Sequence, residues 1–134
     1  MPRLSDWEAR LGAYLEAVRE RPHVYGEHDC ALHGASVVEA LTGVDHGAPF
    51  RGRYSTELGA ARALRTIGAG SLEATFDQHL APVPVAFAGR GDLVMTASAI
   101  GVCIGGDALF VGQDGDQPGL VRLPRRLWAK AWKV

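Results

Sequence analysis

The feature that most constrains the fold is a change in the spacing of apolar residues near Val85. Before this point, apolar residues recur every three or four positions, which is typical of amphipathic helices. After it, short alternating runs separated by glycine-rich turns predict strands near 92–96, 99–105 and 108–112. Such strands must be antiparallel neighbours, because a parallel return needs a crossover of about a dozen residues. We therefore expect an α+β fold in which N-terminal helices pack on a C-terminal antiparallel sheet.

The central helix is predicted to run from Cys30 to Thr42. Asp29 can cap its first turn, and Gly43 suits a left-handed residue at its end. Its small residues predict that another backbone, a sheet, packs close against it. They are Ala31, Gly34, Ala35 and Ser36.

Other helices are predicted on either side of it. The first spans 6–21, behind a capping box made by Ser5 and Glu8. A third begins after residue 55 or 56, and a short fourth begins at Ser71. Their apolar faces hold Leu58, Ala61, Leu64 and Ile67 in the third, and Leu72, Phe76 and Leu80 in the fourth. Residues 44–54 are expected to form a loop ordered by Phe50 and Tyr54.

The C-terminal residues continue this pattern. Residues 120–123 are expected to add one more strand. The tail 124–134 is predicted to be a helix with Leu127, Trp128, Ala131 and Trp132 on one face, either closing the core or exposed for docking.

The chain has 134 residues, a length that predicts a single domain spanning 1–134. Its net charge of −1 argues against a broad basic face for nucleic acid or anionic lipid. No apolar stretch approaches the roughly 18 residues that a membrane span needs. We expect a protein that is made in the cytoplasm. Its two cysteines, Cys30 and Cys103, lie in different settings and predict two separate thiols rather than a disulfide.

Cys30 is the candidate for chemistry. A cysteine at a helix N-terminus meets unpaired N–H groups and the positive end of the helix dipole, which favour thiolate. The alternative is that Cys30 is a small buried apolar residue among alanine and glycine.

Two segments resemble the NlpC/P60 family of papain-like cysteine peptidases. They are Tyr-Gly-Glu-His-Asp-Cys-Ala at 25–31, followed by a helix, and Gly-Asp-Leu-Val at 91–94, followed by Ile-Gly-Val-Cys-Ile-Gly at 100–105. The resemblance implies a papain-like fold with Cys30 as nucleophile. It also implies that Tyr25 and Asp29, the residue that precedes the nucleophile, belong to the substrate-binding site. It places Ala99 where the family has its catalytic histidine, and alanine accepts no proton.

The stretches Gly-Val-Asp at 43–45 and Arg-Gly-Arg-Tyr at 51–54 further resemble small phage and prophage proteins of this fold, encoded among tail genes. This resemblance implies tail proteins or peptidoglycan as partners, and the virion tail as a second location.

Other histidines are candidates for the missing base. His28 lies two residues before Cys30, and His33 lies one helical turn after it. His46 and His79 lie in or near loops. For each of them the alternative is an ordinary surface histidine.

A metal site made by His28, Cys30, His33 and Cys103 has no known zinc spacing, so we expect no metal and no cofactor. Cys103 is instead expected in the core, on the sheet face turned to the central helix. Arg90-Gly91-Asp92 is interpreted as a turn into the first strand, and 114–116 as a hairpin turn.

Two hypotheses remain. The first is a tail (tail-tip) component that has lost the standard dyad and binds tail proteins or cell wall. The second is an active cysteine hydrolase, a peptidoglycan endopeptidase or amidase, with Cys30 as nucleophile and a displaced histidine as base.

Overall fold

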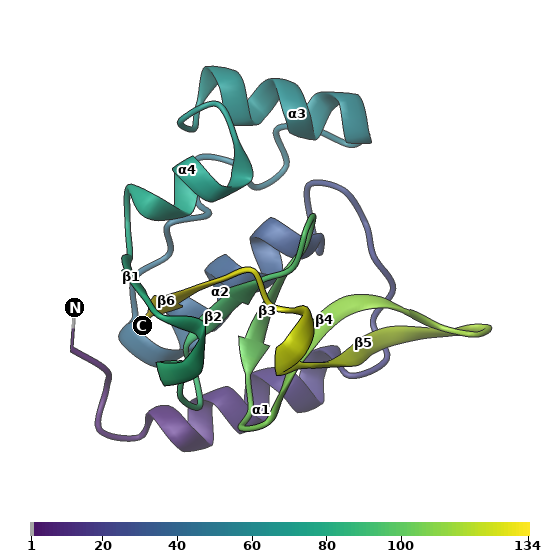
Figure 1. Ribbon diagram of the computed structural model, residues 1–134. Helices are drawn as coiled ribbons and strands as arrows, with labels where there is room; N and C mark the ends of the chain where they lie inside the picture. The colour runs from purple at the N-terminus through teal and green to yellow at the C-terminus, as the bar shows by residue number, and fades with distance from the viewer. Residues whose placement is uncertain (1) are drawn as a thin grey trace.

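The computed structural model describes residues 2–134, in which the helices come first and the strands follow (Figure 1). In the view of Figure 1, α1 lies on one side of α2, and α3 and α4 lie on the other. The helices are α1 (Trp7–Val18), α2 (Cys30–Thr42), α3 (Glu57–Thr66) and α4 (Leu72–Asp77). Two short 3₁₀ helices are η1 (Val85–Phe87) and η2 (Arg125–Leu127).

The strands of the described residues form one six-stranded antiparallel sheet in the order β1-β6-β2-β3-β4-β5. They are β1 (Ala81–Val83), β2 (Leu93–Met95), β3 (Ile100–Cys103), β4 (Asp107–Asp114), β5 (Gln117–Pro124) and β6 (Lys130–Lys133). The predicted antiparallel succession from β2 to β5 is confirmed. So is the hairpin turn, since Asp114 pairs with Gln117.

The central helix agrees with its prediction at both ends. Asp29 accepts a hydrogen bond from the N–H of Leu32 at 2.9 Å, and Gly43 has φ +81°. The close approach of the sheet is also confirmed, because a Cβ on Gly34 would lie 2.8 Å from the Ile100 side chain and 3.0 Å from Phe76. Gly34 therefore lets β3 and α4 approach α2.

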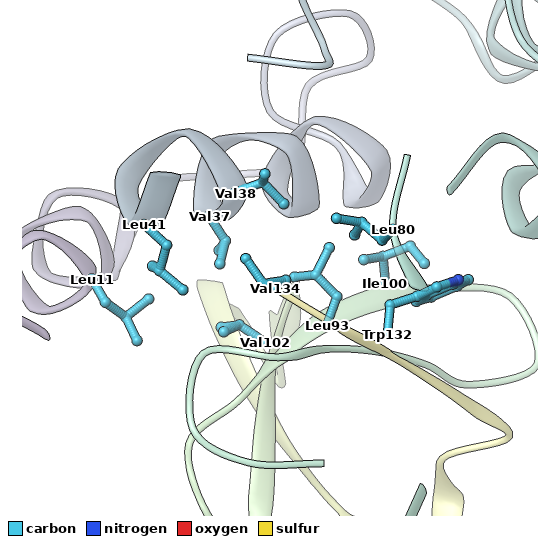
Figure 2. Close-up of a cluster of buried hydrophobic side chains, with 10 residues drawn as sticks. All are labelled: Leu11, Val37, Val38, Leu41, Leu80, Leu93, Ile100, Val102, Trp132 and Val134. Atoms are coloured by element: carbon cyan, nitrogen blue, oxygen red, sulfur yellow. The ribbon is translucent and has the colours of Figure 1, made fainter. Parts of the chain in front are cut away.

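The apolar core lies between α2 and the sheet. Figure 2 shows Val37, Val38 and Leu41 of α2 facing residues of β2, β3 and β6, with Leu11 of α1 at one end. A second buried cluster lies on the other face of the sheet. It contains Ala88, Val94, Cys103, Ala108, Phe110, Trp128 and Ala131. Both faces of the central strands are therefore covered.

The prediction that residues 124–134 form a helix is wrong. Residues 125–127 form η2, and β6 then inserts between β1 and β2. Ala131 and Trp132 are neighbours along β6, so they face opposite sides of the sheet, and both are buried. Two adjacent apolar residues can belong to the apolar face of a helix or to a strand that is buried on both faces, so the sequence pattern does not distinguish the two structures.

Cys103 packs in the core as expected, but on the opposite face from α2. Ile100 and Val102 lie in the cluster that faces α2, whereas Cys103 lies in the second cluster. The prediction of its face was wrong because the side chains that alternate toward α2 begin at Ile100 rather than at Ala99.

The prediction of a capping box made by Ser5 and Glu8 is also wrong. Asp6, not Ser5, is the N-cap of α1, and its carboxylate makes no capping bond. It accepts a hydrogen bond from Arg10 Nε at 2.8 Å instead. The helix starts at Trp7 and ends at Val18, within the predicted range.

The third helix presents a different face from the one expected. Leu58 is 65% exposed and Ile67 is 42% exposed, so neither belongs to the core. Thr56, one of the two candidate caps, caps α3, and Ser71 caps α4 as predicted.

Candidate functional site

The segment before Cys30 forms a tight turn held by side-chain contacts. Val24 and His28 pair as an isolated antiparallel bridge, and Gly26 between them has φ +82°. A side chain at Gly26 would overlap the carbonyl oxygen of Tyr54. Glycine is required here both by its backbone conformation and by the loop packed against it.

Asp29 joins this turn to α2 and to the loop 44–54. Its two carboxylate oxygens accept hydrogen bonds from the N–H of Leu32 at 2.9 Å, the N–H of Gly26 at 3.0 Å and the hydroxyl of Tyr54 at 2.5 Å. It is only 3% exposed. Asp29 was expected to contact substrate, but its carboxylate oxygens accept hydrogen bonds from groups of the protein itself. These bonds fix the position of the neighbouring Cys30.

Tyr54 is a site residue that the sequence interpretation did not assign. Burial, followed by the hydrogen bond to Asp29, raises the pKa of its hydroxyl. Its signal in the sequence was the Arg-Gly-x-Tyr stretch. The same loop is fastened to α2 by Arg51, which donates to Asp45 at 2.9 Å and to Ser36 at 3.1 Å.

Cys30 is the first residue of α2, and its partly buried side chain lines a cavity. Burial raises the pKa of its thiol, and the nearby Asp29 carboxylate raises it further. The backbone N–H groups of Ile100 and Ala31 act in the opposite direction, but the net pKa shift is upward. The expected activation by the helix N-terminus is therefore outweighed by loss of solvent.

His33 lies away from this cavity in the interior of the protein. Its Nδ1 lies 2.7 Å from the Tyr14 hydroxyl and its Nε2 lies 3.0 Å from the Leu109 carbonyl oxygen. Because a carbonyl only accepts, Nε2 carries the proton and Nδ1 accepts from Tyr14. Burial lowers the pKa of His33 to about 4. Both ring nitrogens are therefore occupied.

His28 lies next to His33, with ring centroids 6.0 Å apart, and is 2% exposed. Its Nε2 is buried without a hydrogen-bond partner among the residues that the structure describes. Burial, with a smaller contribution from Arg21, lowers its pKa to about 4. The structure thus groups the two candidate bases with Tyr14.

The cavity beside Cys30 has a volume of about 310 Å³. It is walled by α2, the loop 44–54, α3 and α4. The predicted residues Cys30, Tyr25 and Asp29 come together at it. The apolar lining residues are Ala31, Leu32, Ala35, Val38, Phe50, Ala60, Ala61, Leu64, Leu72, Phe76 and Leu80.

Two further histidines line the same cavity. His46 and His79 stack with ring centroids 4.3 Å apart. The Nε2 of His46 is buried and finds no hydrogen-bond partner within residues 2–134. Burial, and then His79, lower the pKa of His46.

Within residues 2–134, no three His, Cys, Asp or Glu side chains are grouped as a metal ion would need.

The predicted turn at Gly91-Asp92 is present, with φ +91° at Gly91, and it leads into β2. None of the described helices is long and apolar enough to cross a membrane.

The family model described as "Domain of unknown function (DUF6950)" matches residues 2–134. The chain belongs to this family. No curated protein and no solved structure matched the chain.

Proposed function

We propose that this DUF6950 domain is a non-catalytic binding protein with an NlpC/P60-like, papain-like architecture, acting as a component of a phage or prophage tail. The observation that carries the proposal is that neither His28 nor His33 is hydrogen-bonded to Cys30 among the described residues. The thiol lines the cavity, whereas the two rings lie with Tyr14 in the interior.

A cysteine hydrolase needs a thiolate, or a base within about 2.6–3.2 Å that can take the thiol proton. Here burial raises the pKa of Cys30. His33 has no free nitrogen, because Tyr14 and Leu109 occupy both. A base with a pKa of about 4, such as His28, also holds a proton poorly at neutral pH.

The papain-like part of the proposal is supported by the order and placement of its parts. Cys30 opens the central helix, the N–H of Ile100 at the start of β3 lies near its sulfur, and Ala99 precedes that strand. In the NlpC/P60 family that the sequence resembles, a histidine stands at the position that Ala99 occupies in this chain. The tail assignment is supported by the sequence resemblance alone.

The catalytic part is tested by the alkylation rate of Cys30 with iodoacetamide between pH 6 and pH 9. We expect Cys30 to react at pH 7 no faster than a cysteine in an unstructured peptide, and purified muropeptides to remain intact. Cys103 is fully buried, and a Cys103→Ala variant isolates the Cys30 signal. Muropeptide cleavage that disappears in Cys30→Ala would refute the proposal.

The tail part is tested on particles from a host that carries the gene. We expect the protein to co-sediment with tails, and Cys30→Ala to assemble as well as the unchanged protein. A protein found only in the soluble lysate, or assembly lost with Cys30→Ala alone, contradicts this part.

One observation favours an active cysteine hydrolase as the second candidate. His46 lines the same cavity as Cys30, and its Nε2 has no partner among the described residues. In that case His46→Ala abolishes muropeptide cleavage, while His23→Ala, a change at an exposed histidine, leaves it unchanged.

A further inference from the structure

Two exposed apolar side chains lie on the 3₁₀ helices η1 and η2. Phe87 of η1 is 77% exposed, more than any other large apolar residue within residues 2–134, and Leu127 of η2 is 45% exposed. Pro84 and Ala86, the chain neighbours of η1 and Phe87, are exposed as well. Exposed apolar residues that gather in this way, rather than singly, are typical of interaction surfaces.

A single side chain joins η1 to η2. The guanidinium of Arg125, in η2, donates hydrogen bonds to the carbonyl oxygens of Val85 at 2.6 Å and Ala88 at 3.2 Å, at the two ends of η1. It also donates to the carbonyl oxygen of Gly105 at 2.8 Å and lies 4.5 Å from the centroid of the Trp128 ring. The two exposed apolar side chains therefore come from segments fixed to one another, and little entropy is lost in ordering them when a partner binds.

These segments lie on the side of the sheet turned away from α2. Ala88 and Trp128, which directly follow η1 and η2, belong to the second buried cluster, on the sheet face opposite α2. Each of η1 and η2 has only three residues, whereas α2 covers the other face with 13. A partner that packs on Phe87 and Leu127 would add to this short cover without touching the cavity beside Cys30.

The charges beside the exposed apolar residues are all positive. Segments 84–91 and 120–129 contain four arginines and no Asp or Glu. Arg125 is held by the contacts above, and Arg122 pairs with Asp107 at 3.5 Å. Arg90 and Arg126 are exposed and form no ion pair within residues 2–134. Their guanidinium groups are free to bind carboxylates, which arginine can do through two parallel hydrogen bonds.

The two apolar residues and the two free arginines together form what we call the η1–η2 surface: Phe87, Arg90, Arg126 and Leu127. We propose that the η1–η2 surface docks an acidic segment of a partner protein. Apolar side chains of that segment pack on Phe87 and Leu127, and its carboxylates pair with the two arginines. Aromatic residues and arginine are the types enriched at protein interfaces. The inference rests on the proposed function in that it supplies the contact surface of a binding protein.

Other occupants fit this surface less well. A second copy of the chain, docked through the same surface, would place arginine against arginine. Basic segments that bind anionic lipid carry about four to eight Lys or Arg, and proteins that bind DNA neutralise about six to ten phosphates. The η1–η2 surface has two free arginines, a charge that suits a few carboxylates of a protein.

The test is selection of binders from a displayed library of random peptides. Enriched peptides are synthesised with a fluorophore, and fluorescence anisotropy gives the Kd at low and high salt. We expect the enriched peptides to contain Asp or Glu beside Trp, Phe or Leu, and to bind more weakly at high salt because salt screens exposed charges. Enrichment of basic or uncharged peptides contradicts the proposed partner chemistry.

Substitutions locate the binding. Phe87→Ser should weaken binding of the enriched peptides by at least about tenfold, as loss of an interface anchor does. Leu58→Ser is the matched control, because Leu58 is 65% exposed but lies on α3. Arg126→Glu should weaken binding by about tenfold, and selection against this variant should no longer enrich acidic peptides. Arg62→Glu, at an exposed arginine of α3, should leave binding unchanged.

The inference is overturned if no enriched peptide depends on Phe87, or if Arg126→Glu binds as well as Arg62→Glu. It is also overturned if Phe87→Ser abolishes binding to phosphatidylserine vesicles, binding to single-stranded DNA or self-association instead, since those results assign the surface to another occupant. Cys30→Ala should bind the peptides normally. Failure here is therefore distinct from failure of the proposed function, which the muropeptide and tail experiments decide.

Discussion

The hydroxyl of Tyr54 donates a 2.5 Å hydrogen bond to Asp29, the residue that caps α2 immediately before Cys30. Through this bond the loop 44–54 and the N-terminus of α2 form one unit, and the cavity lies beside it. Asp29 is almost fully buried, and the three hydrogen-bond donors around its carboxyl group replace the water that burial removes.

We expect Tyr54→Phe to lower the free energy of unfolding by about 1.5–3 kcal/mol, because it removes a hydrogen bond to a buried carboxylate. Urea unfolding followed by circular dichroism measures the loss. Tyr25→Phe is the matched control, since the Tyr25 hydroxyl makes no hydrogen bond within the described residues. Equal losses in the two variants would show that the Asp29 contact contributes little.

Stability should fall in acid because of His33. Its pKa is about 4 in the folded protein against an ordinary value of 6.5, so the unfolded chain binds more protons between these pH values. The free energy of unfolding should therefore fall by about 3 kcal/mol from this residue as the pH drops from about 6.5 to about 4. Urea unfolding at a series of pH values gives the profile.

His33→Gln should remove this part of the pH dependence, whatever its effect on stability at pH 7.5. His23→Gln, at an exposed histidine, serves as the control. Parallel pH profiles for the unchanged protein and His33→Gln would contradict the assignment.

Asp92 ties both ends of the described chain to the sheet. This fully buried carboxylate accepts hydrogen bonds from Arg3 and from the N–H of Val134, each at 3.0 Å, and from the N–H of Gly89 at 2.9 Å. Asp92→Asn should cost about 3–5 kcal/mol, because it leaves the Arg3 guanidinium without its buried partner.

The control for Asp92 is Asp107→Asn, which breaks a 3.5 Å ion pair with the exposed Arg122. Its effect should stay below about 1 kcal/mol. Thermal unfolding of both variants measures what the loss of each ion pair costs. Similar decreases in melting temperature would contradict the larger contribution expected of the buried Asp92.

Gly34 and Gly12 should respond in opposite directions to alanine. At Gly34 the new methyl group meets Ile100 at 2.8 Å and Phe76 at 3.0 Å, so we expect a loss of about 1–3 kcal/mol. At Gly12, in α1, nothing lies within 4 Å, and alanine should stabilise the helix by about 1 kcal/mol. A stabilised Gly34→Ala would mean that α2 lies farther from β3.

The prediction succeeded where neighbouring residues decide the structure. Asp29 and Gly43 set the ends of α2, and Thr56 and Ser71 cap the next two helices. Each of these contacts spans only a few residues, so the printed sequence contains both partners. The turn at Gly91 follows from the same local chemistry.

The candidate site was predicted only in part. Cys30, Tyr25 and Asp29 meet at the cavity because they lie within one turn and the first residues of α2. The sequence places His33 one helical turn from Cys30, yet the sheet and α1 enclose its ring, and the contacts with Tyr14 and Leu109 come from other elements. Whether the His33 side chain faces the cavity or the interior therefore depends on how α1 and the sheet pack against α2.

The sequence by itself determined the order of the four helices, the antiparallel succession from β2 to β5 and the position of Cys30 at the start of α2. Caps, turns and apolar periods act over a few residues, so they do not depend on distant parts of the chain. Tertiary structure decided that 130–133 is a strand rather than a helix, since β6 exists only between β1 and β2. It also decided the pKa of Cys30, because burial depends on elements far from residue 30 and outweighs the effect of the adjoining helix.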